Sequence, residues 1–367
     1  MKIGLLGGSF DPIHIGHVSV VEEAIKEFEL DQFYFIPTGV NPWKDQQNAS
    51  NEHRIKMIEI AIKKIQSDKF IGIENYEIQH NQEKNYTVDT LKYLTSTNPE
   101  HQYYYFMGMD QAALFDQWKD AKAISEMAQL VCFDRGGYTT ESQNLSKYHF
   151  IKMKHSPLCA SSSEIRAGHI ELLDQDVLKY ISQNGLYLET MIKDRMKEKR
   201  YLHTLSVAKL ASEIAESNQL NAKQAYIAGI MHDVAKETKH DEAYELMQKH
   251  YPQFIDKPEP VWHQWLSAYV SEHEFLIEDP VILKAIEDHT TASPTISKIG
   301  MCLYVADKLD PLRGYDSSAD IELCKKDILE GFKKSLQSFY DFSMKKGRSI
   351  DPCFFDVYNR FVKGRDE

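Results

Sequence analysis

A segment near the amino terminus, rich in small residues and carrying two histidines, constrains the fold of this chain most strongly. It runs from Gly7 to His17, directly after a short apolar run (Ile3–Leu6) and before a helical pattern (Val18–Phe28). A strand, a glycine turn and a helix in this order place the unpaired N–H groups and positive dipole of a helix at a strand end. Glycines also let the backbone approach a ligand closely. The segment predicts a site for nucleotide phosphates; a glycine-rich turn with two surface histidines is the plainer alternative.

The first half of the chain alternates strand-like and helix-like segments. Further strands are expected at Gln32–Pro37, Phe70–Ile78, Gln102–Gly108, Gln129–Asp134 and Tyr148–Lys154. Strands separated by helices form βαβ units, which predict a Rossmann-like α/β domain with a parallel sheet and right-handed crossovers. Ligands of such sheets bind at the carboxyl ends of the strands, where the opening segment stands.

Long helical stretches dominate the second half, which predicts an all-α helical bundle. We expect the change near Leu188, just after the helix-capping pair Asn184-Gly185, and hence domains over residues 1–188 and 189–367. The expected helices are Asp194–Ser217, Ala222–Lys236, Val261–Glu274, Pro280–Asp288, Ser297–Leu309 and Ile321–Lys345. A chain of 367 residues is long enough for two domains with separate cores.

Composition limits the class of partner. A net charge of -12 argues against a broad nucleic-acid-binding face and favours small substrates, while it allows a local basic pocket for phosphates. The five cysteines lie far apart with no C-x-x-C pair, which indicates reduced thiols. No signal peptide is evident, and no apolar run approaches the roughly 20 residues needed to span a bilayer. We therefore expect a cytoplasmic protein without nucleic-acid or membrane partners.

The opening segment resembles the T/HxGH signature of nucleotidylyltransferases, and its fuller form, GGSFDPxHxGH, is similar to that of bacterial nicotinate mononucleotide adenylyltransferases. Residues Ser161–Arg166 resemble the same family's I-S-S-T-x-I-R signature, with Ser163 in place of Thr. Further matches lie at Asn41–Lys44, Tyr86–Leu91 and Gly108–Asp110, so the resemblance covers the whole first half.

Two other families share part of this pattern. Class I aminoacyl-tRNA synthetases also carry H-I-G-H, but their K-M-S-K-S loop has lysine where His155 stands here. Phosphopantetheine adenylyltransferases share the opening fold, but they usually carry Thr at the position of His14 and lack the later segments.

The resemblance implies adenylyl transfer from ATP to nicotinate mononucleotide, with release of pyrophosphate. Because a phosphate oxygen attacks the α-phosphorus in line, such an enzyme mainly positions substrates and neutralises charge. His14 and His17 are the implied catalytic residues, and Mg²⁺ is expected to bridge the phosphates. The implied ATP- and phosphate-binding residues are Gly8, Ser9, Phe10, Gly16, Lys44, Asp110, Ser162, Ser163 and Arg166.

Two residues are implied for the nicotinate mononucleotide pocket, Thr87 and Trp118. An indole face can stack on a positively charged pyridinium ring. The alternative for Trp118 is an ordinary core position.

Six potential metal ligands occur in order along the helical half: His203, His232, Asp233, His263, His289 and Asp307. Such residues on separate helices can converge in a bundle core, and His with Asp suits a divalent metal. From Asp194 to Arg313 this half resembles the HD-domain phosphohydrolases that split diadenosine tetraphosphate symmetrically, although Gln264 stands where a small residue is usual.

This second resemblance implies a centre of two divalent metals, often iron, bridged by Asp233, at which an activated water splits the substrate into two ADP molecules. Arg200, Lys236 and Arg313 would hold the polyphosphate. The alternatives are another substrate, such as a dNTP or a guanosine polyphosphate, or a silent nucleotide-sensing domain. The presence of all six ligands argues against silence, so the sequence predicts a bifunctional enzyme.

Overall fold

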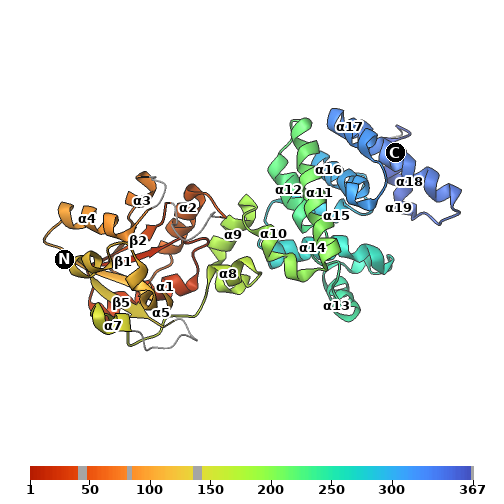
Figure 1. The fold of residues 1–367 in the computed structure, drawn as a ribbon. Coiled ribbons are helices and arrows are strands. Elements are labelled where there is room, and N and C mark those ends of the chain that lie inside the picture. The colour runs from red at the N-terminus through yellow and green to blue at the C-terminus, as the bar shows by residue number, and fades with distance from the viewer. Residues whose placement is uncertain (40–47, 81–84, 135–142, 365–367) are drawn as a thin grey trace. The chain divides into compact units, whose positions relative to one another are not determined.

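The computed structural model describes residues 1–39, 48–80, 85–134 and 143–364 (Figure 1). The chain divides into two compact units, Met1–Val177 and Leu178–Glu367. Helix α9 (Gln175–Asn184) runs across this division. The domain boundary near Leu188 stays a prediction.

The first unit is built on a parallel sheet of six strands in the order β3-β2-β1-β4-β5-β6. The strands are β1 (Lys2–Gly8), β2 (Gln32–Pro37), β3 (Phe70–Ile73), β4 (Gln102–Gly108), β5 (Gln129–Phe133) and β6 (Ile151–Lys152). The order reverses between β1 and β4, and ligands of open α/β sheets bind beside such a reversal, outside the carboxyl ends of the strands. The expected α/β fold with a parallel sheet is confirmed.

Short and medium helices connect these strands. They are α1 (Ile15–Phe28), α2 (Asn51–Ile62), α3 (Tyr76–Gln79), α4 (Thr87–Thr97), α5 (Met109–Ala113), η1 (Phe115–Gln117), α6 (Ala121–Met127), α7 (Gln143–Lys147), α8 (Ser162–Arg166) and η2 (Ile170–Leu172).

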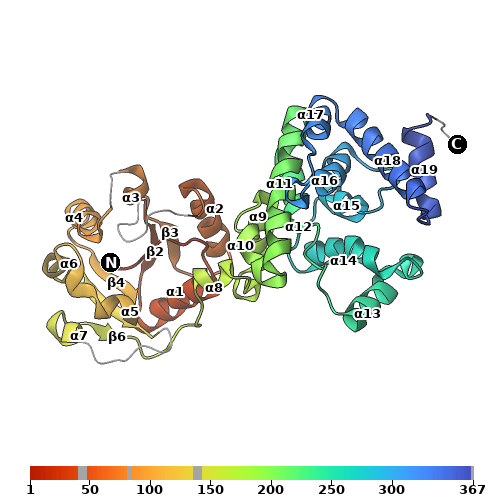
Figure 2. The ribbon, with the colours of Figure 1, turned by 45° about the vertical axis from the view of Figure 1, so that its right-hand side comes forward.

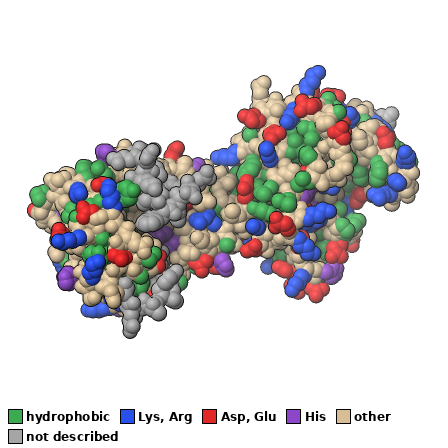
Figure 3. Space-filling model, viewed as in Figure 1, with side chains coloured by type: hydrophobic (Ala, Val, Ile, Leu, Met, Phe, Trp, Pro, Cys, Tyr) green, Lys and Arg blue, Asp and Glu red, His purple; other side chains and the backbone are tan. Residues whose placement is uncertain are grey.

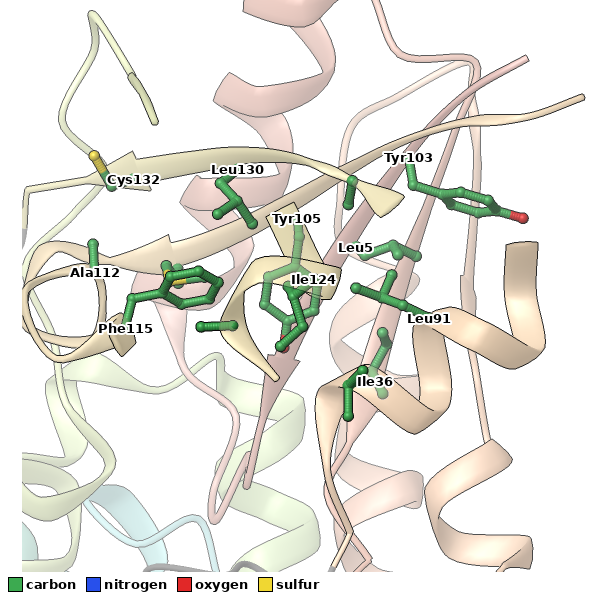
Figure 4. Packing of buried hydrophobic residues seen from close by; sticks show 14 of the residues in the cluster. Leu5, Ile36, Leu91, Tyr103, Tyr105, Ala112, Phe115, Ile124, Leu130 and Cys132 are labelled. Carbon is green, nitrogen blue, oxygen red and sulfur yellow. The ribbon is translucent and has the colours of Figure 1, made fainter. Parts of the chain in front are cut away.

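One face of the sheet packs against α4 and α6 through a buried apolar cluster (Figure 4). Leu5 and Leu130 project from the strands, Leu91 from α4 and Ile124 from α6, and each is at most 1% exposed. Fully burying one such side chain stabilises a fold by roughly 1.5–3 kcal/mol. This packing fixes the strands whose carboxyl ends carry the predicted site.

Two expected strands are shorter than the sequence indicated. Residues Phe70–Ile78 were expected to be one strand, but β3 ends at Ile73 and α3 follows, where the Glu74 side chain accepts a hydrogen bond from the Tyr76 N–H. Of Tyr148–Lys154 only Ile151–Lys152 form β6, because the Phe150 N–H before them bonds to the carbonyl of Leu145 in α7. Local hydrogen bonds thus end β3 early and delay the start of β6.

The second unit is helical, as expected, and Figure 2 shows α11, α12, α15 and α16 grouped together. Its helices are α10 (Leu188–Met191), η3 (Lys193–Arg195), α11 (Glu198–Ser217), α12 (Ala222–Met231), α13 (His240–His250), η4 (Pro252–Phe254), α14 (Glu259–His273), α15 (Pro280–Asp288), α16 (Lys298–Leu309), η5 (Pro311–Arg313), α17 (Ser318–Lys326), α18 (Ile328–Lys345) and α19 (Pro352–Phe361). The sequence reading did not include α13 and α19.

One expected helix of this unit ends early and another is divided into two. The helix expected over Ala222–Lys236 stops at Met231, and the Ala235 N–H donates to the Ser267 hydroxyl of α14 instead of continuing the helix. The one expected over Ile321–Lys345 breaks at Asp327, whose carboxylate accepts from the first N–H groups of α18.

The surface carries both signs of charge. On the face drawn in Figure 3, acidic and basic side chains are interspersed over each unit. Among the helices of the described ranges, none combines the length and the apolar character that crossing a membrane requires.

Candidate active sites

The two histidines of the opening segment form a pair where β1 ends and α1 begins. His14 is the residue immediately before α1, and His17 lies in the first turn of that helix. Their rings stack with centroids 3.7 Å apart, and both side chains are buried. The edge of Phe10 packs on His17 at a centroid distance of 4.9 Å. The segment thus presents two adjacent imidazoles at a helix N-terminus, where phosphates bind readily.

Close contacts explain why glycines stand in this segment. A Cβ on Gly7 would lie 2.1 Å from the Tyr105 hydroxyl, and one on Gly16 would lie 2.8 Å from the carbonyl of Leu158. At Gly8 the nearest neighbour is the Phe10 ring, 3.2 Å away. Side chains at Gly7 and Gly16 would therefore displace the segment.

The second signature docks onto the first, although they lie far apart in the sequence. The Ser162 hydroxyl donates to the carbonyl of Pro12 over 2.8 Å, and Arg166 donates to the carbonyl of Asp11. A second guanidinium nitrogen of Arg166 lies 3.3 Å from the Ser163 hydroxyl. The structure thus brings these predicted phosphate-site residues together with the loop after β1.

A residue that the sequence reading missed supports the same loop. Arg54 of α2 is fully buried and donates to the carbonyl of Ser9 over 2.5 Å and to that of Thr38 over 2.7 Å. The sequence held one signal for Arg54, which shares the buried face of α2 with Met57 and Ile58. A charged residue on such a face is expected to have partners, because an unpaired charge is rarely buried.

Thr87 and Trp118 meet at a third residue, Tyr105. The Thr87 hydroxyl lies 3.4 Å from the Tyr105 hydroxyl, and the Trp118 ring packs edge-on to Tyr105 with centroids 6.2 Å apart. Burial raises the pKa of Tyr105, so this phenol stays protonated as a hydrogen-bond donor. The half-buried Trp118 also packs on Phe115, with centroids 5.4 Å apart. The sequence reading missed Tyr105, which sits in an aromatic run of β4.

Asp110 and Lys44 complete the predicted nucleotide residues. Asp110 lies in α5, directly after β4; its Oδ1 is buried and has no hydrogen-bond partner among the described residues, while Oδ2 accepts from Gln111. Lys44, with the rest of Asn41–Lys44, lies outside the described residues.

In the second unit, all six predicted metal ligands converge. His203 projects from α11, His263 from α14 and Asp307 from α16, while His232 with Asp233 follows α12 and His289 follows α15. Two groups of three have one ligand atom each within 4.8 Å of one another: His203, His232 and Asp307, and His232, Asp233 and His289. The Nε2 atom of His263 lies 3.3 Å from Asp233 and 3.1 Å from His289 Nε2.

Hydrogen bonds orient the histidine rings of this cluster. In His232, His263 and His289, Nδ1 lies 2.6–2.8 Å from the backbone carbonyl three residues earlier. A carbonyl can only accept, so each Nδ1 carries the hydrogen and each Nε2 keeps its lone pair for the centre. The Nε2 atom of His232 is buried and has no hydrogen-bond partner among the described residues. A ring oriented in this way fits a metal ion.

The charges of the cluster also suit a cation. Burial lowers the pKa of His263 to about 3 and that of His289 well below its usual value, so both rings are neutral at pH 7. Although burial alone would raise the pKa of Asp233, the surrounding histidines and Lys236 hold it below its usual range. Neutral imidazoles and ionised carboxylates are the forms that bind divalent metals.

The three predicted polyphosphate-binding residues each contact one of these ligands. Arg200 pairs with Asp233, Lys236 Nζ lies 2.8 Å from His263 Nε2, and Arg313 donates to Asp307 over 2.7 Å. Three basic groups therefore stand at the edge of the cluster.

Two threonines that follow His289 in the sequence lie close to the cluster. The Thr290 hydroxyl lies 3.1 Å from His263 Nε2 and 3.0 Å from His289 Nε2. The buried Gln264, which departs from the family pattern, hydrogen-bonds to Thr291. Gln264 is thus accommodated without displacing His263.

Comparison with known proteins gives a consistent result for each half. The first half matches the cytidylyltransferase-like family over residues 5–182, and the second matches the HD domain over residues 200–312. A Mycoplasma genitalium protein named "Probable nicotinate-nucleotide adenylyltransferase/Ap4A hydrolase" is 31% identical, with 94% of this chain and 97% of that protein covered. A Mycoplasma pneumoniae protein of the same name is 28% identical, with 91% and 97% covered.

A solved structure from Clostridium acetobutylicum, described as a "predicted HD superfamily hydrolase involved in NAD metabolism", also aligns with this chain. It is 23% identical, with 48% of this chain and 96% of its own chain covered and a TM-score of 0.44.

The similarity to the Mycoplasma genitalium protein extends over nearly the whole of both chains and includes both domains in the same order. This chain therefore belongs to the family of proteins in which a nicotinate-nucleotide adenylyltransferase domain is followed by an HD domain.

Proposed function

We propose that the first unit transfers the adenylyl group of ATP to nicotinate mononucleotide, giving nicotinate adenine dinucleotide and pyrophosphate. The observation that carries this proposal is the stacked pair of His14 and His17 at the start of α1, with the segment Ser162–Arg166 docked on the same loop. The family to which the chain belongs supports the substrate assignment.

In this reaction a phosphate oxygen of the mononucleotide attacks the α-phosphorus of ATP, and the bond to the β-phosphate breaks. His14 and His17 donate hydrogen bonds to the phosphate oxygens, on which charge shifts towards the leaving pyrophosphate. Gly8, Ser9, Phe10 and Gly16 shape the loop that faces these phosphates, and Arg166 holds that loop in place. Fixed donors of this kind stabilise the transition state without reorganising during the reaction. Mg²⁺ on the polyphosphate would neutralise further charge.

The mononucleotide is assigned to the region of Thr87, Tyr105 and Trp118. Trp118 offers an indole face to the positively charged pyridinium ring of nicotinate mononucleotide. Thr87 stands at the first turn of α4, where N–H groups and a hydroxyl suit the nicotinate carboxylate.

For the second unit we propose metal-dependent hydrolysis of a dinucleoside polyphosphate, with diadenosine tetraphosphate giving two ADP. Convergence of six ligand side chains and three basic residues supports a phosphohydrolase site, and the names of the Mycoplasma relatives support the substrate. The residues that would hold two divalent ions are His203, His232, Asp233, His263, His289 and Asp307. Iron is the metal we propose. Bound metals would lower the pKa of a water and neutralise phosphate oxygens.

Product analysis tests both halves of the proposal. With Mg²⁺, ATP and nicotinate mononucleotide, the full chain should release pyrophosphate. With added Fe²⁺ or Mn²⁺ it should convert diadenosine tetraphosphate to ADP faster than it hydrolyses a dNTP or a guanosine polyphosphate. A faster reaction with one of the latter would reassign the substrate of the second unit.

The variant Asp233→Ala distinguishes a second unit that hydrolyses nucleotides from one that only senses them. If the second unit is a hydrolase, this variant loses bound metal and hydrolysis but keeps adenylyl transfer within a few-fold of normal. Altered transferase kinetics, together with no hydrolysis by the wild-type chain under any added metal, would show a sensor instead. Circular dichroism checks the fold, since loss of a metal can unfold a domain.

A further inference from the structure

One histidine of the metal-ligand cluster is oriented differently from the other three. Whereas Nδ1 of His232, His263 and His289 faces a neutral backbone carbonyl, Nδ1 of His203 lies 2.5 Å from the Oδ2 atom of Asp310. On the other side of the same ring, Nε2 lies 3.1 Å from Asp307. His203 therefore joins a carboxylate outside the six-residue set to one inside it.

Asp310 is held rigidly for this contact. It follows α16 directly, is 1% exposed, and its Oδ1 atom accepts from the Ser206 hydroxyl over 2.6 Å and from the Leu312 N–H over 3.1 Å. These two donors occupy one carboxylate oxygen and turn the other towards His203. A buried carboxylate with all its hydrogen bonds in place is a stable orienting group.

We infer that Asp310 is a positioning residue for metal binding, because it fixes the hydrogen of His203 on Nδ1 and directs the Nε2 lone pair to the centre. A carboxylate behind a ligating histidine also makes that ligand more basic than a carbonyl does. This inference rests on the proposed metal-dependent function of the second unit.

Asp310→Asn tests the inference with the least change of shape. The amide oxygen can keep the bonds from Ser206 and Leu312, which leaves the amide N–H₂ facing His203 Nδ1. Nδ1 must then accept, so the ring hydrogen moves to Nε2, where it opposes a cation. We expect Co²⁺ affinity of the full chain to fall 10- to 100-fold, as is typical when such a partner is lost.

The measurement is a Co²⁺ titration against a competing chelator, with the visible absorption of bound Co²⁺ reporting its coordination. Asp279→Asn is the matched control, because Asp279 caps α15 through the Val281 N–H and accepts from Gln224 but touches none of the six ligands. Its affinity and spectrum should equal those of the wild-type chain. If Asp310 only capped the turn after α16, the variants Asp310→Asn and Asp279→Asn would have the same Co²⁺ affinity and spectrum.

The outcomes separate the inference from the function on which it rests. A wild-type chain that binds no Co²⁺ would overturn the proposed metal site itself. A wild-type chain that binds Co²⁺, together with an unchanged Asp310→Asn affinity, would overturn only the role of Asp310.

If Asp310→Asn does not fold, ¹⁵N-histidine NMR of the Zn²⁺-loaded wild-type chain decides. The hydrogen of His203 is expected on Nδ1 and the metal on Nε2. The reverse assignment would refute the inference.

Discussion

Arg54 donates a hydrogen bond of 2.5 Å from Nη1 to the backbone carbonyl of Ser9, which lies 45 positions earlier in the chain. The same guanidinium donates from Nη2 to the carbonyl of Thr38 and to the side chain of Asn51. One buried side chain therefore ties together the loops that follow β1 and β2. The position of the loop after β1 therefore depends on a residue of α2.

Arg54→Met should loosen that loop while it keeps much of the side-chain volume. Each buried carbonyl that loses its donor costs about 1–3 kcal/mol. We expect Tm to fall by about 4 °C or more, because 1 kcal/mol corresponds to about 2–4 °C in a domain of this size. The kcat/KM for adenylyl transfer should fall at least about tenfold, since small displacements of positioning groups are costly.

Lys56→Met is the matched control for Arg54→Met, because Lys56 lies on the same helix but is exposed and pairs only with Glu59 in the described structure. Its Tm and kinetics should stay close to those of the wild-type chain. Equal behaviour of the two variants would mean that Arg54 does not position the loop. Calorimetry and a pyrophosphate-release assay supply the measurements.

His17→Ala should reduce adenylyl transfer by roughly 100-fold or more, the loss typical of removing one donor to transition-state charge. Hydrolysis in the second unit should remain, because the two candidate sites use separate residues. The exposed His155, which faces Glu27 at 3.7 Å, supplies the control variant His155→Ala. Normal turnover by His17→Ala would remove this imidazole from the mechanism.

Substrate choice tests the assignment of Thr87 and Trp118. Nicotinate mononucleotide should exceed nicotinamide mononucleotide in kcat/KM, because the amide loses a charge-assisted hydrogen bond that the carboxylate makes. Trp118→Ala should raise KM for the mononucleotide, while Trp118→Phe should recover part of the loss through its aromatic face. Equal efficiencies for the two mononucleotides would refute the assignment.

Much of the fold was predictable because its signals are local. The bounds of β2 and β4 match the sequence prediction, since continuous apolar runs, typical of buried parallel strands, and neighbouring turn residues specify them. The end of α12 was not predictable, because it depends on the Ser267 hydroxyl of α14, which takes the Ala235 N–H. Contacts between distant segments thus override a continuous helical pattern.

The residues of the candidate sites also differ in whether the sequence identifies them. Histidines and aspartates in family-like spacing are visible from residue type, so the six residues that the structure brings together in the second unit could be named in advance. Tyr105, Arg54 and Asp310 could not, because their roles arise only when the fold brings them to Thr87, Ser9 and His203. Arg54 shares the buried face of α2 with Met57 and Ile58, which indicates burial, but the immediate neighbours of these three residues do not identify the contacts they make.

A buried glutamate should make the stability of the first unit depend on pH. Glu77 of α3 is 6% exposed, and burial raises its pKa to about 7, although hydrogen bonds from Thr90 and the Gly39 backbone oppose that shift. The positive charge of Arg54 also lowers the pKa of Glu77, and the negative charge of Asp89 raises it. In the unfolded chain the same carboxyl titrates near 4.5. Between these values the folded state binds more protons than the unfolded state.

Stability linked to Glu77 is therefore fully present below pH 4.5 and is lost as the pH rises through about 7. Glu77→Gln stays neutral throughout, so it should remove this loss. At pH 8 the variant is expected to exceed the wild-type chain by up to about 3 kcal/mol, because a tenfold change in proton affinity is worth about 1.4 kcal/mol. At pH 5 the two should differ little.

Hydrogen exchange of the slowest amides in β1 and β4 measures this difference within the full chain, because these strands report the first unit alone. The exposed Glu126 supplies the control variant Glu126→Gln, whose unfolding free energy should follow that of the wild-type chain at every pH. A Glu77→Gln profile parallel to the wild-type profile between pH 5 and pH 8 would show that Glu77 is ionised in the folded protein over the whole range. Convergence at pH 5 with divergence at pH 8 is the expected result, since only the wild-type carboxyl must lose its proton in a buried site.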